Sequence, residues 1–409
     1  MVSATGGAGL PRVLVVHNAY QQRGGEDTVV EAETALLRQH GHAVHRYQRS
    51  NDEVAASSTW QLARDTVWSP RTGADIARLV TDFRPDIIHV HNSLPLVSPS
   101  VYWAAARARV PVVQTLHNFR LICPQAMLLR DGRVCEDCVG RVPWRAAVHG
   151  CYRGSALQSA AVAGMLQAHR ALGTWRHKVS LYIALNAFCR DKFIEGGLPA
   201  ERIRIKPNFV DLPAPAPVPR QGFLFAGRLS HEKGLAVLAQ ALRGAPQALN
   251  GEVSIAVNIA VNIAGTGPDE ALLDGLPGVQ RLGALPAAAL YAQMASASAL
   301  LLPSIWYENF PRTLVEAYAC GLPVIASRLG ALATLVHEGE TGLLFEPGNA
   351  ADLARQLAWA AGHPDAMAQM GRRARQLYEQ QLTGAANYAA LRAIYAEALA
   401  AAQGAAGAE

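Results

Sequence analysis

Two glutamates flank the predicted start of a helix in the second half of the chain. Glu308 lies in a loop after the apolar run 299–302, and Glu316 lies inside the helix predicted over Thr313–Cys320, whose first turn suits Pro311. Eight residues of helix would turn the two carboxylates roughly 80° apart, so we do not expect them to act as one pair. The free amides and positive dipole end of the helix start favour a phosphate. A sugar nucleotide, with hydroxyl groups on both sides of a phosphate, suits this layout, and an ordinary buried helix with two solvated glutamates is the alternative.

A second candidate anion site lies in the loop after the predicted strand Phe223–Ala226. Arg228 and Lys233 lie between Gly227 and Gly234, where the next helix is expected to begin. Ligands of open parallel sheets bind at the carboxyl ends of the strands. The loop is not a Walker phosphate loop, because the G-K-[ST] ending is absent. We therefore predict an anion-binding loop, with a charged surface loop as the alternative.

Glycines and histidines follow the predicted strands of the first half. Gly24 and Gly25 precede the first helix and would let the backbone approach a ligand, although the spacing is not G-x-G-x-x-G and a plain turn is the alternative. His91 and His117 each follow a strand end, so both are expected at the cleft. His89 lies within its strand and is expected to be packed. A metal site built on His89 and His91 is not expected, because no third ligand is evident in the sequence.

Four of the six cysteines cluster in one insertion: Cys123, Cys135, Cys138 and Cys151. A C-x-x-C pair with two flanking cysteines fits a closed tetrahedral zinc site, and in a reducing compartment such a cluster argues for a metal before a disulfide. Reduced thiols or occasional disulfides, and an iron–sulfur cluster, are the alternatives. Asp131 and Gly132 predict a hairpin turn just before the pair. Any role is expected to be structural, because four thiolates leave no open position for chemistry.

Strand and helix patterns alternate along both halves, which is typical of doubly wound parallel sheets in an α/β fold. The prolines of segment 213–219 predict a semi-rigid linker between the halves. Segment 339–345 reads as a hairpin-like turn. The tandem duplication within 255–264 has no functional interpretation. The predicted strands are Arg12–His17, Ala43–Tyr47, Asp86–Val90, Val112–Leu116, Ser180–Leu185, Arg202–Lys206, Phe223–Ala226, Val279–Leu282 and Ala299–Leu302, with a further one beginning at Val324.

Length and charge restrict the classes of function. The 409 residues suggest two or three domains, and half of them are apolar. A net charge of +5 suits an anionic small-molecule donor or loose contact with a membrane surface, and it is too diffuse to argue for nucleic acid. The N-terminus lacks the apolar core of a signal peptide, and no apolar run is long enough for a membrane helix. We expect a soluble cytoplasmic protein, with peripheral contact at the inner membrane face left open.

In this order and at these distances, the motifs resemble glycosyltransferase family 4, retaining transferases of the GT-B fold with two Rossmann-like domains facing a cleft. The motifs are Glu308 and Glu316 with seven residues between them, Pro303-Ser304 before them, A-x-x-x-G-x-P-V after them, and G-R-L-x-x-x-K-G at 227–234. Pro207-Asn208, Gly24-Gly25 and His117 also match. The resemblance implies an acceptor-side domain at 1–208 with the cysteine insertion at 119–155, a nucleotide-sugar domain at 209–384, and a C-terminal helix, 385–409, that crosses back.

The resemblance also implies roles for single residues. It implies catalytic roles for Glu308, His117, Arg228 and Lys233. It implies donor-binding roles for Gly24, Gly25, Gly227, Asn309, Phe310, Arg312, Thr313, Leu314 and Glu316. Arg228 and Lys233 would hold the donor diphosphate, with the backbone amides at 312–314. Glu308 would contact sugar hydroxyls and Glu316 the ribose. Pro311 stands where the family often has glycine, and the side chain of Asn309 is expected to compensate for the missing amide.

The implied activity is transfer of a hexose-type sugar, with retention, from a nucleoside-diphosphate sugar to a glycan or lipid-linked acceptor in polysaccharide or glycolipid assembly. No cofactor is expected for catalysis, since the chain contains no Asp-x-Asp. The leaving phosphate would accept the proton of the acceptor. Two alternatives remain: a GT-B sugar phosphorylase, and a catalytically silent nucleotide-sugar-binding protein. The base, the sugar and the acceptor are not indicated by the sequence.

Overall fold

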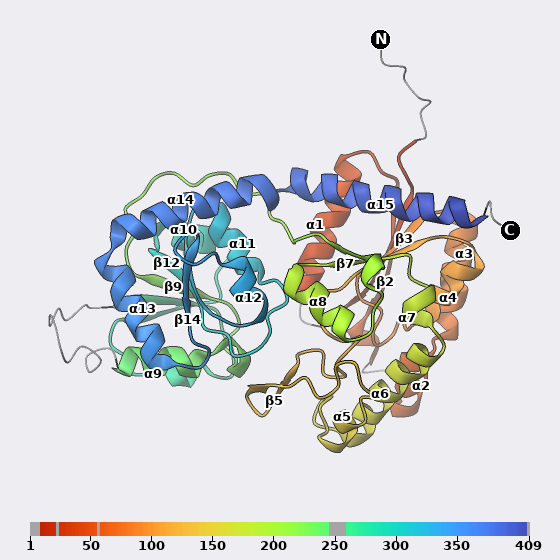
Figure 1. Cartoon of the computed structure of the whole chain (residues 1–409), viewed down its shortest axis with the longest axis horizontal. Helices are drawn as coiled ribbons and strands as arrows, with labels where there is room; N and C mark the ends of the chain where they lie inside the picture. The colour runs from red at the N-terminus through yellow and green to blue at the C-terminus, as the bar shows by residue number, and fades with distance from the viewer. Residues whose placement is uncertain (1–8, 22–23, 55–57, 245–258, 407–409) are drawn as a thin grey trace, which may run out of the picture.

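Two parallel sheets, one in each half of the chain, form the framework of the molecule (Figure 1). The structure is a computed structural model that describes residues 9–21, 24–54, 58–244 and 259–406. Each sheet has six strands in the described residues, and a separate two-stranded hairpin lies in the cysteine insertion. The α/β fold class predicted from the strand and helix alternation is confirmed.

The first sheet has the order β2-β1-β3-β4-β7-β8, with every neighbouring pair parallel. β1 and β3 are fully buried, as expected where helices cover both faces of a parallel sheet. Its strands are β1 (Val13–Ala19), β2 (Val44–Ser50), β3 (Ile87–Val90), β4 (Val112–Thr115), β7 (Leu181–Ala184) and β8 (Ile203–Ile205).

The helices of the first half include α2, which the sequence analysis did not predict. Its N-cap is Ser58, whose hydroxyl accepts from the amide of Gln61. The helices are α1 (Gly25–Gln39), α2 (Thr59–Val67), α3 (Pro70–Phe83), α4 (Ser100–Arg107), α5 (Arg145–Val148), α6 (Ala156–Ala171), α7 (Thr174–His177) and α8 (Ala187–Glu195), with short 3-10 turns η1 (Asn51–Val54) and η2 (Ala200–Arg202).

The second sheet has the order β11-β10-β9-β12-β13-β14. Segment 339–345, predicted as a hairpin-like turn, instead contains the edge strand β14, which pairs parallel with β13. The prediction was wrong because four residues carry little strand pattern without their partner. Part of the 255–264 duplication lies outside the described residues. The strands are β9 (Phe223–Ala226), β10 (Val261–Ala264), β11 (Val279–Gly283), β12 (Ala299–Leu302), β13 (Val324–Ser327) and β14 (Gly342–Phe345).

The helices of the second half end in a long pair that returns to the first half. α14 and α15 run along one side of the molecule in Figure 1, and Leu391 and Tyr395 of α15 pack with Val13 and Val15 of β1. The helices are α9 (Leu235–Gly244), α10 (Ala287–Ser296), α11 (Arg312–Ala319), α12 (Gly330–Leu335), α13 (Ala350–Gly362), α14 (Pro364–Gln381) and α15 (Gly384–Ala406), with 3-10 turns η3 (His231–Lys233) and η4 (Glu270–Leu273).

The cysteine insertion contains the predicted hairpin. β5 (Leu129–Arg130) and β6 (Arg133–Val134) pair antiparallel around Asp131 and Gly132, which both have positive φ. The hairpin lies at the lower side of the junction between the halves in Figure 1.

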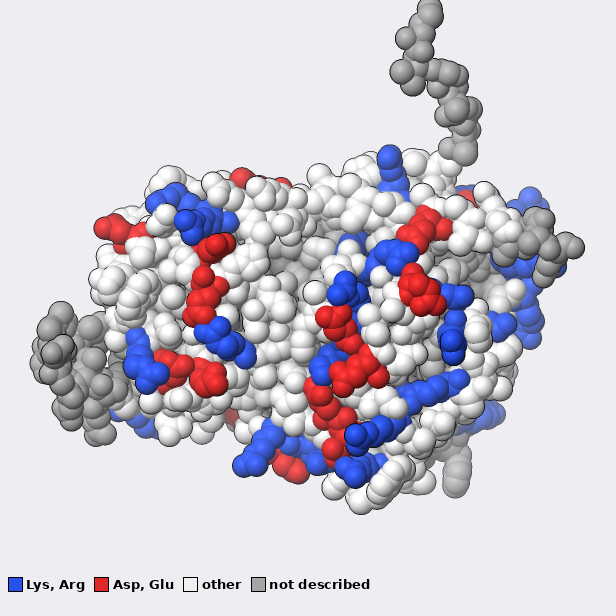
Figure 2. Space-filling model, viewed as in Figure 1, with Lys and Arg blue, Asp and Glu red and all other residues white. Residues whose placement is uncertain are grey.

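Charges on the visible face are mixed. Figure 2 shows acidic and basic side chains interspersed over both halves, with no single basic region on that face. None of the described helices combines the length and apolar character needed to cross a membrane.

Candidate functional site

The loop after β9, residues 227–234, packs backbone against backbone on the loop after β12. Gly234 has a φ of +74°, and a Cβ built on it would lie 1.8 Å from the carbonyl oxygen of Pro303. The amide of Ile305 donates to the carbonyl of Glu232 at 3.0 Å. Because β9 and β12 are neighbours in the sheet, the two loops leave the same edge. Glycine at 234 is what permits this contact, and the contact brings Lys233 beside Glu308.

Lys233 and Glu308 form an ion pair at this edge. Lys233 Nζ lies 2.7 Å from Glu308 Oε1, and the hydroxyl of Ser304 donates to the same oxygen at 2.7 Å. The ammonium group also lies 5.5 Å from the ring centroid of Trp306. The Glu308 side chain is 6% exposed and that of Lys233 is 26% exposed. Two residues predicted for the sugar and the phosphate of one donor therefore meet at one point.

Arg228 lies in the same loop and is exposed. Its guanidinium has no ion-pair or hydrogen-bond partner among the residues that the structure describes. Gly227, just before it, has a φ of +156°. The guanidinium of Arg228 is therefore available for a charge-assisted hydrogen bond with a ligand anion.

The helix that starts near Glu308 begins one residue earlier than the predicted Thr313. Pro311 is the N-cap, with φ −67° and ψ 119°, and α11 begins at Arg312. The amide of Leu314 donates to the carbonyl of Pro311 at 3.1 Å, so the prediction that it meets phosphate is not supported by this geometry. The amides of Arg312 and Thr313 have no acceptor among the described residues, as expected for the first turn. Two of the three predicted amides are thus free to bind an anion.

Glu316 lies apart from Glu308 and has its own partners. Its Oε1 lies 3.0 Å from Arg312 Nε and accepts from the hydroxyl of Tyr291 at 3.4 Å. Burial raises its pKa, while Arg312 and Tyr291 act in the opposite direction. The two glutamates do not form a pair, as predicted. The side chain of Arg312 is therefore also part of the site, whereas the sequence analysis had predicted a role for its backbone amide.

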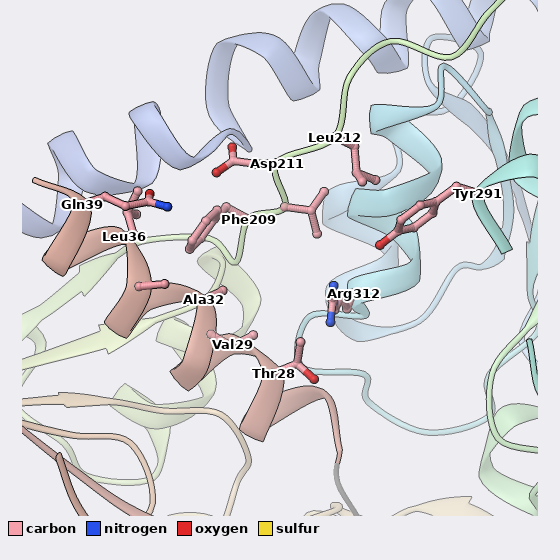
Figure 3. Close-up of a pocket in the computed structure, with 12 residues that line it drawn as sticks. Thr28, Val29, Ala32, Leu36, Gln39, Phe209, Asp211, Leu212, Tyr291 and Arg312 are labelled. Atoms are coloured by element: carbon pink, nitrogen blue, oxygen red, sulfur yellow. The ribbon is translucent and has the colours of Figure 1, made fainter. Parts of the chain in front are cut away.

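A cavity of about 210 Å³ opens beside Arg312 at the junction of the two halves. Figure 3 shows Tyr291 and Arg312 on one side of it, Thr28, Val29 and other side chains of α1 on the other, and the start of the linker above them. It is lined by Thr28, Val29, Ala32, Ala35, Leu36, Gln39, Phe209, Val210, Asp211, Leu212, Tyr291 and Arg312.

Asn309 and Phe310 are not placed as predicted. The Asn309 side-chain amide donates to the carbonyl of Leu116 at 3.1 Å, and its oxygen accepts from the thiol of Cys189, both in the first half. Asn309 therefore joins the halves, and it does not replace the amide that Pro311 lacks. Phe310 packs in the apolar core of the second half, because its ring is excluded from water there. Neither side chain is available to a donor in this arrangement.

His117 follows Leu116 and lies in a chain of buried polar groups. Its Nε2 lies 2.9 Å from Nδ1 of His91, whose Nε2 lies 3.4 Å from Glu33 Oε1. Burial, then the neighbouring His91, holds the pKa of His117 well below its usual range, so the ring is neutral near pH 7. When His91 carries one proton, Glu33 holds that proton on Nε2. His117 then donates from Nε2 and keeps Nδ1 as an acceptor.

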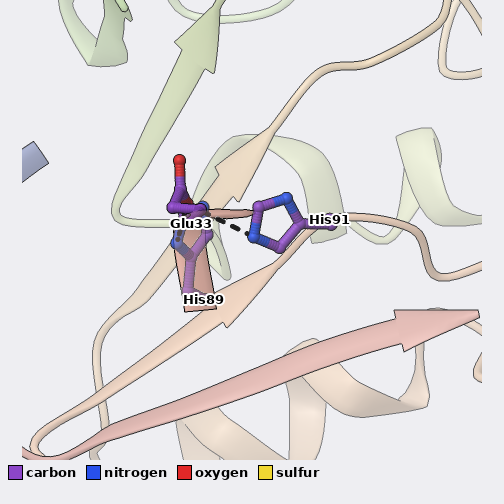
Figure 4. A group of neighbouring side chains, drawn as sticks. All are labelled: Glu33, His89 and His91. Atoms are coloured by element: carbon purple, nitrogen blue, oxygen red, sulfur yellow. Dashed lines mark ion pairs between the residues drawn. The ribbon is translucent and has the colours of Figure 1, made fainter. Parts of the chain in front are cut away.

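Glu33, His89 and His91 come close enough to hold a metal ion (Figure 4). The third group that the sequence did not reveal is thus a glutamate on α1. Glu33 Oε2 is also 2.6 Å from Nζ of Lys206, and both side chains are 1% exposed. Burial acts to raise the pKa of Glu33. The neighbouring charges, Lys206 foremost, outweigh that effect and hold the pKa well below its usual range. The ammonium already supplies the compensating cation, so we assign no metal here.

The same chain reaches the linker and the last helix. Lys206 Nζ donates to Asn387 Oδ1 at 3.2 Å, and Asn387 Nδ2 donates to the carbonyl of Pro207 at 2.7 Å. His89 Nδ1 lies 2.7 Å from the hydroxyl of Tyr395 on α15. Candidate cleft residue His117 is thereby connected, through buried hydrogen bonds, to the segment that joins the halves.

The start of α1 adds a carboxylate that the sequence analysis missed. Gly24 precedes the helix, and Gly25 is exposed, since a Cβ on it would meet nothing within 4 Å among the residues that the structure describes. Beside it, Glu26 Oε2 accepts from the hydroxyl of Tyr20 at 3.0 Å and from Asn118 Nδ2 at 3.4 Å. Its Oε1 is buried without a hydrogen-bond partner in the described residues. Burial raises the pKa of Glu26 to about 8. The signal in the sequence was a glutamate directly after the glycine pair.

The four clustered cysteines line one small cavity, although they come from three separate segments of the insertion. Burial, then the other three thiols, raises the pKa of Cys138 to about 11. The remaining cysteines, Cys189 and Cys320, are buried elsewhere in the molecule. The predicted clustering in sequence is therefore also a clustering in space.

Two family models match the chain in succession. "Glycosyltransferase Family 4" matches residues 23–213, and "Glycosyl transferases group 1" matches residues 214–377. The chain is 27% identical over 303 residues to the phosphatidyl-myo-inositol mannosyltransferase of Mycobacterium leprae, covering 71% of this chain and 68% of the relative. It is 29% identical over 354 residues to the glycogen synthase of Mycobacterium tuberculosis, covering 81% and 73%.

The fold also has solved neighbours. Anabaena Alr3699/HepE in complex with UDP-glucose superposes with a TM-score of 0.65 at 19% identity, over 95% of this chain and 100% of the neighbour. At that identity the likeness concerns the fold alone, and it agrees with two facing parallel-sheet domains.

Proposed function

The chain belongs to glycosyltransferase family 4, and from this we propose that it moves a hexose-type sugar from a nucleoside-diphosphate sugar to a hydroxyl group of a glycan or lipid-linked acceptor, with retention and without a metal ion in catalysis. The observation that carries the proposal is the meeting of Lys233, Glu308 and the free start of α11 at one edge of the second sheet. A diphosphate bearing a sugar needs cations and amides for its charge and an acceptor group for its hydroxyls, and this edge has all three.

The cations act on the leaving group. As the bond between the anomeric carbon and the phosphate oxygen breaks, negative charge builds on the diphosphate. Arg228, Lys233 and the amides of Arg312 and Thr313 stabilise that charge from fixed positions. Without a ligand, Lys233 pairs with Glu308. An incoming phosphate gives the ammonium of Lys233 a second anionic partner. The carboxylate of Glu308 is then free to accept hydrogen bonds from sugar hydroxyls. The departing phosphate oxygen takes the proton of the acceptor hydroxyl on the same face, which accounts for retention.

The first half contributes neutral polar groups. His117 is neutral near pH 7, and its free Nδ1 accepts a hydrogen bond from a donor-sugar hydroxyl. Glu26, whose buried Oε1 lies 4.0 Å from Nδ1 of His17, holds Tyr20 and Asn118 through its Oε2 beside the exposed Gly25, where we expect the acceptor hydroxyl. The nucleoside has room near Glu316, where Arg312 and Tyr291 border the cavity. The complex of Anabaena Alr3699/HepE with UDP-glucose makes UDP-sugars the first donors to test.

The decisive experiment is a transfer assay with UDP-, GDP- and ADP-sugars on the purified chain and on Arg228→Ala. Loss of one charge-assisted contact to the leaving group is expected to lower kcat/KM by about 100-fold, or about 2.7 kcal/mol in the barrier. Arg355→Ala is the matched control, because Arg355 is 67% exposed on α13 and pairs only with Asp352 in the described residues.

Three results would contradict the proposal. Full activity of Arg228→Ala would remove the diphosphate from the loop at 227–234. Release of a sugar phosphate that needs inorganic phosphate and no nucleotide sugar would instead favour a phosphorylase. Nucleotide binding by calorimetry, without turnover on any glycan or lipid acceptor, would favour a silent binding protein.

A further inference from the structure

Four thiols face one cavity in the insertion between β4 and α6. The space is about 20 Å³, close to the roughly 10–15 Å³ that one water-sized body requires. Cys123 comes from the turn after Phe119, Cys135 and Cys138 from the segment after β6, and Cys151 from the segment after α5. No three of the four sulfurs lie within 4.8 Å of one another in this arrangement, so a bound ion would have to draw them together. Four thiolates are nevertheless the donor set of a structural zinc site.

The surroundings of the thiols suit a negatively charged metal centre. Zinc with four thiolates carries a net charge of −2, and the side chains of Arg130 and Arg145 line the same cavity, held together by Asp137 at 2.8 Å and 3.4 Å. The amide of Ala146, which donates to the carbonyl of Pro143 at 3.2 Å, also acts to lower the pKa of Cys138, against the larger effect of burial. Amide donors and nearby cations stabilise thiolate sulfurs, which is the state a metal requires.

Part of the insertion is anchored in the core of the first half, where Ile122, Leu128 and Val139 are buried, but its hairpin has little support of its own. β5 and β6 have two residues each, and an isolated hairpin of two strands is marginal in water. Trp144 and Val148 of the same insertion are exposed. A short segment without its own core needs a staple such as a metal.

The stapled segment touches the donor side of the cleft. A Cβ on Gly132, at the hairpin turn, would lie 2.9 Å from Nε2 of His231, two residues before Lys233. Glu136, between the paired cysteines, lies 2.8 Å from Nζ of Lys192, and its carboxylate, after burial, contributes to the raised pKa of Tyr307, the neighbour of Glu308. The insertion therefore bridges the two halves beside the proposed donor site.

We propose that Cys123, Cys135, Cys138 and Cys151 bind one zinc ion, and that this ion holds the 129–134 hairpin and Glu136 against the donor loops. The metal has no open coordination position and takes no part in the transfer. The inference concerns the insertion's own chemistry, so its first test does not need the chain to be an active transferase.

The first test is metal analysis of the full chain purified under reducing conditions without added zinc. About one zinc per chain is expected, retained after brief dialysis against a weak chelator. Cys138→Ala is expected to lose the zinc, whereas Cys320→Ala, which removes a buried thiol in the second half, is expected to keep it. If Cys138→Ala does not fold, the wild-type chain refolded with cobalt(II) serves instead, and the absorption of tetrahedral thiolate coordination is expected.

Three results would overturn the zinc assignment. They are less than one metal per several chains, equal zinc in Cys138→Ala and wild type, and iron with sulfide in place of zinc. Each result is read from the metal and sulfide content of the purified chain, so a failure here is separate from a failure of the proposed transferase activity.

The bridging role is tested by hydrogen–deuterium exchange before and after zinc removal. Faster exchange is expected both in the hairpin at 129–134 and in the loop at 304–308, while β1 is unchanged. Faster exchange confined to the insertion would contradict the bridge and leave the zinc site intact. Glu136→Gln gives a second readout, because it keeps all four thiols and is expected to loosen only the loop at 304–308.

Discussion

Lys233 and Glu308 illustrate how one oxygen can organise a site. Glu308 Oε1 accepts from both the ammonium of Lys233 and the hydroxyl of Ser304, while the carboxylate is almost completely buried. A buried carboxylate without such partners would be costly. The pair keeps both charges in place before a ligand arrives, so the two side chains are already positioned for a diphosphate.

Glu26 makes stability depend on pH in a predictable direction. Burial raises its pKa to about 8, whereas the unfolded chain titrates at about 4.3. Its contribution is therefore fully present below about pH 4.3 and is lost as the pH rises through about 8. Glutamine does not titrate, so we expect Glu26→Gln to remove that loss. Between pH 5.5 and pH 8.5, the free energy of unfolding of the variant should therefore rise relative to that of wild type by up to a few kcal/mol.

Thermal unfolding of both proteins at the two pH values measures this gain. Glu201→Gln, at an exposed position of the same half, is the control and should show no such difference. A constant offset between Glu26→Gln and wild type at both pH values would contradict the prediction. His17, whose pKa burial lowers to about 4, acts over a window that overlaps the lower part of this range, because its contribution to stability is lost as the pH falls from about 6.5 through about 4.

Among the structural elements, the loop after β9 depends most on one position. Gly234 combines a φ of +74° with a backbone contact that leaves no room for a Cβ. We expect Gly234→Ala to destabilise the second half by about 2–4 kcal/mol and to weaken donor binding, because either the loop or Pro303 must move.

Denaturation followed by tryptophan fluorescence, together with nucleotide binding by calorimetry, tests the Gly234→Ala prediction. Gly362→Ala is the matched control, because a Cβ on that helical glycine would meet nothing within 4 Å. Wild-type affinity and stability of Gly234→Ala would mean that the two loops are not packed as described.

For the molecule as a whole, α15 holds the two halves in one assembly. It begins beside Asp211 of the linker, whose carboxylate accepts from the amide of Gly384 at 2.8 Å, and Leu391 is buried against the first sheet. We expect Leu391→Ala to cost about 2–5 kcal/mol and to lower the unfolding temperature of the first half. The covering of the first half thus depends on the last segment of the chain.

Scanning calorimetry is the appropriate measurement for Leu391→Ala, because a chain with two large units need not unfold in one step. Arg392→Ala, one residue further on the exposed side of α15, is the control. Equal unfolding profiles of Leu391→Ala and wild type would show that the first half is stable without α15.

Local patterns predicted much of this protein. Apolar runs with glycine or proline at their ends located most strands, the hairpin at Asp131-Gly132 and the loop positions of Arg228, Lys233 and Glu308, because these features depend on residues close together in the chain. The same reading erred on β14 and α2, where a short segment takes its form from a neighbour or a cap.

Contacts between distant residues came only with the folded chain. Glu33 meets Lys206 across 173 positions, and Asn309 meets Leu116 across 193. Composition and periodicity carry no record of such pairs, because a buried charge or amide is satisfied by whichever group the packing of sheets and helices brings to it. The order of elements and the chemical types at the site were therefore written in the sequence, while the partners of each site residue depended on the packing of the two halves.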